Sequence, residues 1–106
     1  MQRYGQIIGV KPEQVEAYEK IHAEVWPEVL EMIARCNMHN YTIFRFGYLL
    51  FAYFEYTGDD FEADMAIMAA DPKTREWWSH TSPMQAPLEG RAPGEWAKMK
   101  EVFHTD

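Results

Sequence analysis

The most regular hydrophobic pattern in the chain covers residues 15–33, where apolar residues recur at helical spacing. A helix turns by about 100° per residue, so Tyr18, Val25 and Val29 fall within one narrow wedge of its surface. His22 lies inside the same wedge, among residues that should face the core. The pattern predicts an amphipathic helix in which His22 is either a core residue or a functional residue. Periodicity leaves both alternatives open.

The rest of the pattern predicts strands and helices in a mixed order. A proline interrupts the long helix at Pro27, and two aromatic runs on either side of Gly47 are typical of a β-hairpin. The predicted strands cover 4–10, 41–46, 48–56 and 101–103, the predicted helices cover 12–35, 60–70 and 72–81, and a loop covers 83–94. The order β-α-β-β-α-(α)-β predicts one α+β domain, residues 1–106, with the ferredoxin-like β-α-β-β-α-β sandwich.

Both faces of the predicted hairpin carry large apolar side chains. Alternation along a strand places Tyr41 and Ile43 on one face and Phe44 and Phe46 on the other. Helices are expected on one face of a ferredoxin-like sheet, so the second apolar face needs another cover. In a chain of 106 residues we expect that cover to be a second subunit, which predicts a homodimer.

Charge and cysteine content narrow the expected partners and compartment. The formal net charge of −7, with ten scattered basic residues, disfavours nucleic acid and anionic membranes and favours a neutral or cationic small molecule. No apolar run approaches the roughly 20 residues that span a bilayer, and the segment 1–5 has no signal-peptide features. The single cysteine, Cys36, cannot form an intramolecular disulfide, so we expect a core residue in a protein of the reducing cytoplasm.

Few familiar catalytic motifs are present. The sequence has no glycine-rich phosphate loop and no serine in a nucleophile elbow. Its four histidines lack a tight ligand spacing, so no metal site is expected. The adjacent Trp77 and Trp78 are either core residues or a platform for the apolar side of a sugar ring. Because neighbouring helical residues point about 100° apart, at most one of them should face a given pocket.

Several short motifs follow one another along nearly the whole chain. They are Tyr18 with His22, Trp26-Pro27-Glu28, His39-Asn40-Tyr41, Leu49-Leu50-Phe51-Ala52, Trp77-Trp78 and Glu101-Val102-Phe103. In this combination they resemble the L-rhamnose mutarotase family. The resemblance implies a ferredoxin-like protomer that pairs sheet to sheet as a dimeric α/β-barrel. It also implies an isomerase that interconverts the α and β anomers of L-rhamnose without a cofactor or a metal.

The resemblance also assigns roles to particular residues. His22 would be the proton donor, and the sugar would be contacted by Tyr18, Tyr41, Trp77 and Trp78. Mutarotation opens and recloses the sugar ring, which a positioned acid–base group accelerates by about 10²–10⁴-fold. An imidazole suits this step because its unperturbed pKa lies near neutrality. We expect His22 to protonate the ring oxygen, while a phenol or a water serves the anomeric hydroxyl.

Two stretches depart from the family pattern. The hairpin turn at Gly47 is shorter, and the segment 82–87 has a different sequence although it is expected to border the pocket. The sugar is therefore predicted to be L-rhamnose or a related 6-deoxy sugar. Two other classes remain as alternatives: a cofactor-free or haem-using monooxygenase of the dimeric ferredoxin-like type, and a non-catalytic sugar-binding module.

Overall fold

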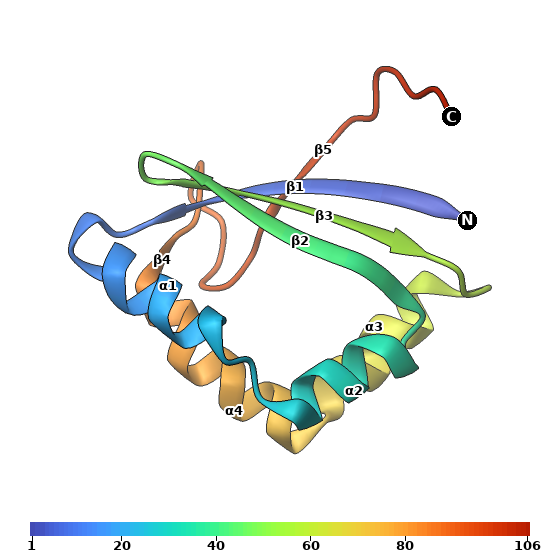
Figure 1. Cartoon of the computed structure of the whole chain (residues 1–106), viewed down its shortest axis with the longest axis horizontal. Helices are drawn as coiled ribbons and strands as arrows, with labels where there is room; N and C mark the ends of the chain where they lie inside the picture. The colour runs from blue at the N-terminus through green and yellow to red at the C-terminus, as the bar shows by residue number, and fades with distance from the viewer.

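The protein is built on an antiparallel sheet with helices along one of its faces (Figure 1). The structure is a computed structural model that describes all residues, 1–106. Its strands are β1 (Gln2–Val10), β2 (Met38–Phe46), β3 (Leu49–Tyr56), β4 (Gln85–Ala86) and β5 (Ala97–Met99). Its α-helices are α1 (Val15–Ala23), α2 (Pro27–Arg35), α3 (Phe61–Ala70) and α4 (Pro72–Thr81), with short 3-10 turns η1 (Pro12–Gln14) and η2 (Ser82–Met84). None of the helices has the length and apolar character needed to cross a bilayer.

β1 lies at the centre of the sheet. It pairs along its length with β3, whose other edge carries β2. The opposite edge of β1 holds two short strands, with β4 against Gly9 and Val10 and β5 against the segment 5–7. All these pairings are antiparallel, and the spatial order β2-β3-β1-β4 is that of the split ferredoxin-like sheet. The predicted α+β, ferredoxin-like fold is confirmed.

The predicted interruption of the long helix is complete. α1 ends at Ala23, and Trp26 has an extended backbone (φ −60°, ψ 136°) before Pro27 opens α2 at its first position. The residue before a proline avoids the helical region, which explains the break. The predicted single wedge of apolar residues is wrong in one respect, because Val25 lies in the break rather than on either helix.

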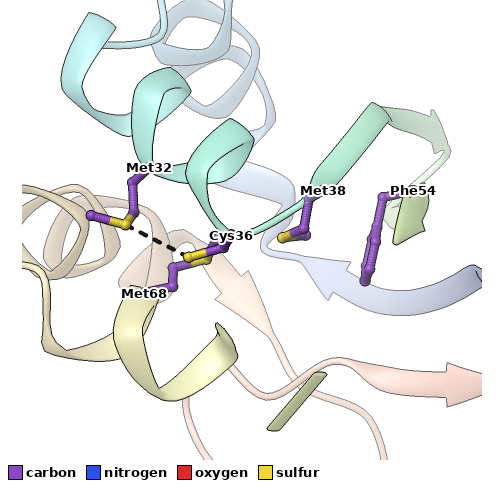
Figure 2. Close-up of a cluster of buried hydrophobic side chains, with 5 residues drawn as sticks. All are labelled: Met32, Cys36, Met38, Phe54 and Met68. Carbon is purple, nitrogen blue, oxygen red and sulfur yellow. Dashed lines mark hydrogen bonds between the residues drawn. The ribbon is translucent and has the colours of Figure 1, made fainter. Parts of the chain in front are cut away.

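Two buried clusters hold the helices on the sheet. One joins α2 and α3 to β2 and β3, as Figure 2 shows, and it consists of Met32, Cys36, Met38, Phe54 and Met68. Cys36 is 1% exposed, so the predicted core role of this residue is confirmed. The other lies near α1 and consists of Ile8, Val10, Tyr18 and Leu50.

Side chains on the other face of the sheet remain exposed. Along β3, Leu50, Ala52 and Phe54 point to the helices and are buried. On the opposite face of β2, Phe44 is 63% exposed and Phe46 is 77% exposed. No helix covers this face (Figure 1), which we call the open face of the sheet. The apolar character predicted for both sides of the hairpin is present.

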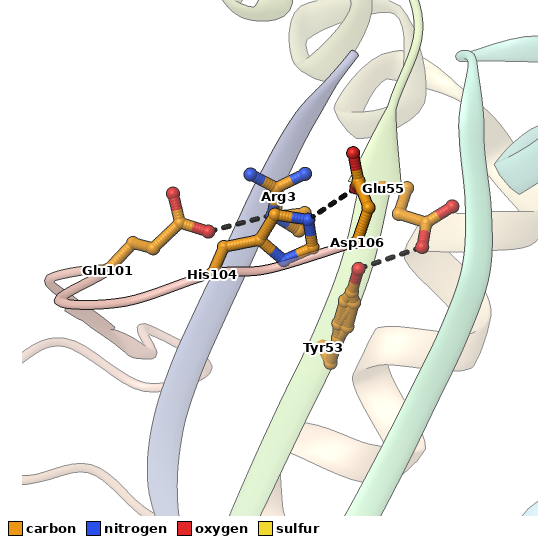
Figure 3. Close-up of polar contacts among 6 residues, drawn as sticks. All are labelled: Arg3, Tyr53, Glu55, Glu101, His104 and Asp106. Atoms are coloured by element: carbon orange, nitrogen blue, oxygen red, sulfur yellow. Dashed lines mark hydrogen bonds and ion pairs between the residues drawn. The ribbon is translucent and has the colours of Figure 1, made fainter.

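The C-terminal strand lies earlier in the chain than predicted. β5 covers Ala97–Met99, and the predicted strand at 101–103 is an irregular segment with exposed side chains. Glu101 still reaches β1, where it accepts a hydrogen bond of 2.8 Å from Arg3 (Figure 3). Strand propensity alone does not make a strand at Val102 and Phe103, because no neighbouring backbone pairs with them.

The predicted loop at 83–94 contains regular structure that the pattern did not indicate. It begins within η2 and continues into β4. The two residues of β4, Gln85 and Ala86, have no strand-like pattern, and they are ordered by pairing with the end of β1. This short pairing places Gln85 within hydrogen-bond distance of the Tyr18 hydroxyl.

Candidate active site

α1 presents two rings that stack on each other. Tyr18 and His22 are one helical turn apart, with ring centroids separated by 4.2 Å and planes inclined by 25°. The Nδ1 atom of His22 lies 2.8 Å from the backbone carbonyl oxygen of Tyr18. A carbonyl oxygen only accepts hydrogen bonds, so Nδ1 carries the proton. In a neutral imidazole this leaves the lone pair on Nε2.

Gln85 holds the other end of Tyr18. Its side chain is 6% exposed, and its Nε2 donates a hydrogen bond of 3.2 Å to the Tyr18 hydroxyl oxygen. The phenol oxygen therefore accepts from Gln85, and its own O–H remains free to donate to a third group. Neither the polarity nor the spacing of Gln85 indicated this role, because it depends on the pairing of β4 with β1.

α4 supplies an aromatic wall beside His22. Trp77 is 6% exposed, and its ring meets His22 edge to face at a centroid distance of 5.3 Å and an angle of 74°. Trp26, in the break between α1 and α2, packs against Trp77 at 5.1 Å and 77°. These contacts fix the imidazole from the side of α4 while Tyr18 fixes it from α1.

A β-bulge turns Tyr41 toward the helices. The β2–β3 register shifts between His39 and Thr42, and Asn40 has a positive φ of 52°. The side-chain amide of Asn40 donates to a carboxylate oxygen of Glu55 at 2.8 Å, which holds this left-handed residue in place. Asparagine tolerates that conformation better than most residues. Tyr41 then packs against the buried ring of Phe54, with centroids 5.5 Å apart.

The five residues expected to form the site line one cavity of about 310 Å³. They are His22, Tyr18, Tyr41, Trp77 and Trp78. Trp77 and Trp78 both line this cavity, although neighbouring residues of a helix point about 100° apart. Its volume lies at the lower end of the range for small-molecule sites, roughly 300–1,000 Å³. A larger, mostly apolar cavity of about 790 Å³ adjoins it and shares the walls formed by His22, Tyr41 and both tryptophans.

Several further residues line the smaller cavity without having been assigned a role from the sequence. They are Ile43, Ser82, Gln85, Pro93, Gly94, Glu95 and Trp96. The expectation that the segment 82–87 borders the pocket is confirmed by Ser82 and Gln85. Trp96 could have been found, since an isolated tryptophan after a proline-rich loop needs an apolar contact. The segment 93–96 reaches the site only because β5 pairs with β1 immediately after it.

Burial sets the protonation states at the site. Loss of solvent lowers the pKa of His22 below the usual 6.5, although its hydrogen bond to the Tyr18 carbonyl partly opposes this. Burial raises the pKa of Tyr18, with the hydrogen bond from Gln85 acting in the opposite direction. Burial also raises the pKa of Tyr41 to about 12. At neutral pH the site therefore holds a neutral imidazole and two protonated phenols.

The arrangement suits proton transfer to a polar ligand. Nowhere in the structure do three or more His, Cys, Asp or Glu side chains gather into a possible metal site. The cavity instead combines one acceptor nitrogen, two phenolic hydroxyls and the faces of indole rings. Such a mixture fits a small molecule with several hydroxyl groups and an apolar side.

Comparison with known proteins places the chain in a family. A sequence profile described as L-rhamnose mutarotase matches residues 3–105. The chain belongs to the L-rhamnose mutarotase family. It is 32% identical over 108 residues to the L-rhamnose mutarotase of Oceanobacillus iheyensis, covering 100% of both chains. It is 34% identical to that of Ligilactobacillus salivarius, covering 98% of this chain and 97% of the relative.

Solved structures show the same fold. An L-rhamnose mutarotase from Formosa agariphila superposes with a TM-score of 0.80 at 21% identity, covering 100% of both chains. The tetracenomycin F2 cyclase of Streptomyces glaucescens, a type-II polyketide cyclase, superposes with a TM-score of 0.68 at 19% identity, covering 99% of this chain and 96% of the cyclase. The fold is thus shared with a protein of a different name, and the fold alone does not determine the function.

Proposed function

We propose that this member of the L-rhamnose mutarotase family interconverts the α and β anomers of L-rhamnose, or of a related 6-deoxy sugar, in the cavity beside His22. The observation that carries the proposal is that His22 and four aromatic residues line one cavity of about 310 Å³. The full-length similarity to L-rhamnose mutarotases supports the same reaction.

The chemistry of the reaction matches the groups in the cavity. Ring opening removes a proton from the anomeric hydroxyl and adds one to the ring oxygen, and closure on the other face of the aldehyde reverses these transfers. His22 is the acid–base group, and the phenols of Tyr18 and Tyr41 bind the hydroxyls of the sugar. The indoles of Trp77 and Trp78 cover the apolar side of the sugar ring and its methyl group. The reaction is an isomerisation in which protons are only exchanged.

The working form is proposed to be a homodimer joined through the open face of the sheet. Support comes from Phe44 and Phe46, which would otherwise leave two large aromatic side chains in water on neighbouring positions of one face. Polar contacts are also present on the central strands and the C-terminal segment (Figure 3). Tyr53 donates a hydrogen bond of 2.8 Å to Glu55, while Arg3 holds Glu101. A protein with one buried, unpaired cysteine also fits the reducing cytoplasm, which is its proposed compartment.

The proposal is tested by measuring anomer exchange directly. Saturation-transfer NMR on L-rhamnose, L-fucose, L-mannose and D-glucose should show exchange above the spontaneous rate for L-rhamnose, with smaller effects for sugars that lack the 6-methyl group or differ in hydroxyl geometry. His22→Ala should reduce the catalysed rate by about 10²–10⁴-fold. His104→Ala is the matched control, because His104 is an exposed residue of the C-terminal segment.

The outcomes separate the alternatives. Sugar binding with exchange at the spontaneous rate would show a non-catalytic module and overturn the proposed reaction. Wild-type catalysis that survives in His22→Ala would leave the mutarotase activity standing but remove His22 from its mechanism. A sugar other than L-rhamnose that reacts fastest would change the substrate while keeping the reaction type.

A further inference from the structure

The hydrogen bonds around Tyr18 leave its hydroxyl proton free for donation and leave a lone pair on His22. Gln85 donates to the Tyr18 oxygen at 3.2 Å, so the phenol proton does not go to Gln85 and can be donated into the cavity. The Tyr18 backbone carbonyl accepts from Nδ1 of His22 at 2.8 Å, so Nε2 presents a lone pair. The two stacked rings therefore offer one donor and one acceptor from the same side of the cavity.

We propose that ring opening begins with neutral His22 as the base and Tyr18 as the acid, and that Gln85 is the positioning residue that directs the Tyr18 proton to the sugar. This inference rests on the proposed mutarotase function and specifies how its site works. It assigns a role to Gln85. It also makes His22 a proton acceptor in the first step, rather than a proton donor.

The step balances in atoms and charge. Nε2 of His22 takes the proton of the anomeric hydroxyl, and the electrons of that O–H bond form the carbonyl. The bond between the anomeric carbon and the ring oxygen breaks, and its electron pair takes the proton of the Tyr18 hydroxyl. An imidazolium and a phenolate result, and the aldehyde rotates. Ring closure returns both protons, so His22 is then the proton donor, which is the role that the family resemblance assigns to it.

Gln85 matters because a buried phenolate needs a hydrogen-bond donor. Burial alone disfavours the charged form of Tyr18, and the N–H of Gln85 is the group that opposes this effect. The imidazolium formed on His22 lies on the face of the same phenol ring, 4.2 Å away between centroids, and offsets its charge. Gln85 and the imidazolium of His22 together stabilise the phenolate of Tyr18 better than either group alone.

Other titratable groups at the cavity are few. Tyr41 approaches from β2, and Glu95 approaches from the segment before β5, while α4 presents the ring of Trp77. One carboxylate oxygen of Glu95 accepts a hydrogen bond of 3.0 Å from the backbone N–H of Ala92. The elements packed against His22 therefore place two phenols and one acid at this cavity, and no Lys or Arg side chain lines it.

The first experiment uses Tyr18→Phe, which keeps the stacked ring but removes the acid. Both assignments of the protons give the wild-type enzyme the same bell-shaped pH profile, since each requires one proton shared between His22 and Tyr18. In the variant only His22 titrates in the reaction. Residual exchange should fall by about 10²–10⁴-fold and should increase as pH rises through the pKa of His22. A residual rate that decreases over that interval would show His22 acting first as an acid and would overturn the proposal.

The second experiment reverses the hydrogen bond with Gln85→Glu. An ionised carboxylate can only accept, so it would take the Tyr18 proton as its partner and suppress donation to the sugar. Activity should be lower than in Gln85→Met, which only removes the donor and should cost about 10–100-fold. The activity of Gln85→Glu relative to that of Gln85→Met should increase as pH falls and the carboxyl is protonated, since both variants lose neutral His22 in the same way. Ala66→Glu, an exposed position on α3, is the matched charge control.

The results distinguish this inference from the proposed function. Absence of catalysed exchange in the wild-type protein would refute the mutarotase proposal itself. A wild-type rate together with equal rates and pH profiles for Gln85→Glu and Gln85→Met would refute the direction of the hydrogen bond alone. Circular dichroism checks that each variant is folded, and if Gln85→Glu does not fold, the pH dependence of Tyr18→Phe still decides the question.

Discussion

A methyl group added at Gly9, outside the cavity, should slow the reaction at the site. Gly9 is on β1 opposite Ala86 of β4, and a Cβ built on it would lie 2.5 Å from the Ala86 carbonyl oxygen and 3.2 Å from the Ala86 Cβ. Ordinary contact begins near 3.4 Å, so the nearer atom is about 0.9 Å too close. The obstructing atom belongs to the backbone and cannot rotate away. In Gly9→Ala, β4 must therefore move away from β1.

The displacement of β4 reaches Tyr18 through Gln85. The hydrogen bond from Gln85 to Tyr18 is already 3.2 Å long, and a shift of most of 0.9 Å carries it beyond hydrogen-bond distance. Overpacking of this kind costs about 1–3 kcal/mol of stability. Loss of a hydrogen bond to a group that becomes charged should lower the rate of anomer exchange by about 10–100-fold. Gly9→Ala should thus be folded, less stable and slow.

The assay combines urea unfolding with saturation-transfer NMR on L-rhamnose. Gly5→Ala is the matched control on the same strand, because its Cβ would meet only the end of the flexible Met99 side chain, at 3.4 Å. This control should keep both stability and rate. The double variant Gly9→Ala with Gln85→Met should be no slower than the slower single variant, since both changes remove one interaction. A wild-type rate in Gly9→Ala, or rate losses that add in the double variant, would refute the coupling through β4.

Three further predictions concern pH, the dimer and the indoles. The pKa of His22 is lower in the folded protein than the usual 6.5, so at pH values between the folded and the unfolded pKa the unfolded chain binds more protons. The free energy of unfolding should therefore decrease as pH falls below about 6.5. Urea titrations at several pH values should show a flatter dependence for His22→Gln. If the protein pairs through the open face as proposed, light scattering should show dimers for the wild type and monomers for Phe46→Glu, whereas Ile67→Glu, which changes an exposed apolar residue on α3, should leave the dimer intact. A dimer that persists in Phe46→Glu, or a monomeric wild-type protein, would contradict the proposed interface. Trp77→Ala should cost about 3–5 kcal/mol because the ring is buried, while Trp78→Ala, with a ring 40% exposed, should mainly raise KM; equal stability losses in thermal unfolding would contradict this division.

Local patterns predicted most of the elements for identifiable reasons. Asp60 and Asp71 each accept a hydrogen bond from a backbone N–H three residues later, so the starts of α3 and α4 follow from N-capping. Pro27 determines where the first helical segment breaks. These signals act over one or two turns of chain, and the elements they govern were correctly predicted.

The errors occur where pairing between distant segments decides the structure. Residues 101–103 have more strand-like side chains than β5, but β5 has the backbone of β1 beside it. Gln85 and Ala86 have little strand propensity and are nevertheless paired with Gly9 and Val10. A two-residue ladder of this kind leaves no periodicity in the sequence. For the same reason Gln85 and Trp96 were absent from the predicted site, although both line the cavity.

The break at Pro27 explains why His22 combines burial with access to a ligand. α1 stops at Ala23, one residue after His22, so the helix does not continue over the imidazole. Trp26, in the break, instead packs on Trp77, whose edge faces His22. A continuous helix would carry Val25 and Val29 along the same face as His22 and would extend an apolar contact over the ring. The apolar wedge that made His22 look like a core residue is therefore divided by the same proline that leaves the cavity open beside it.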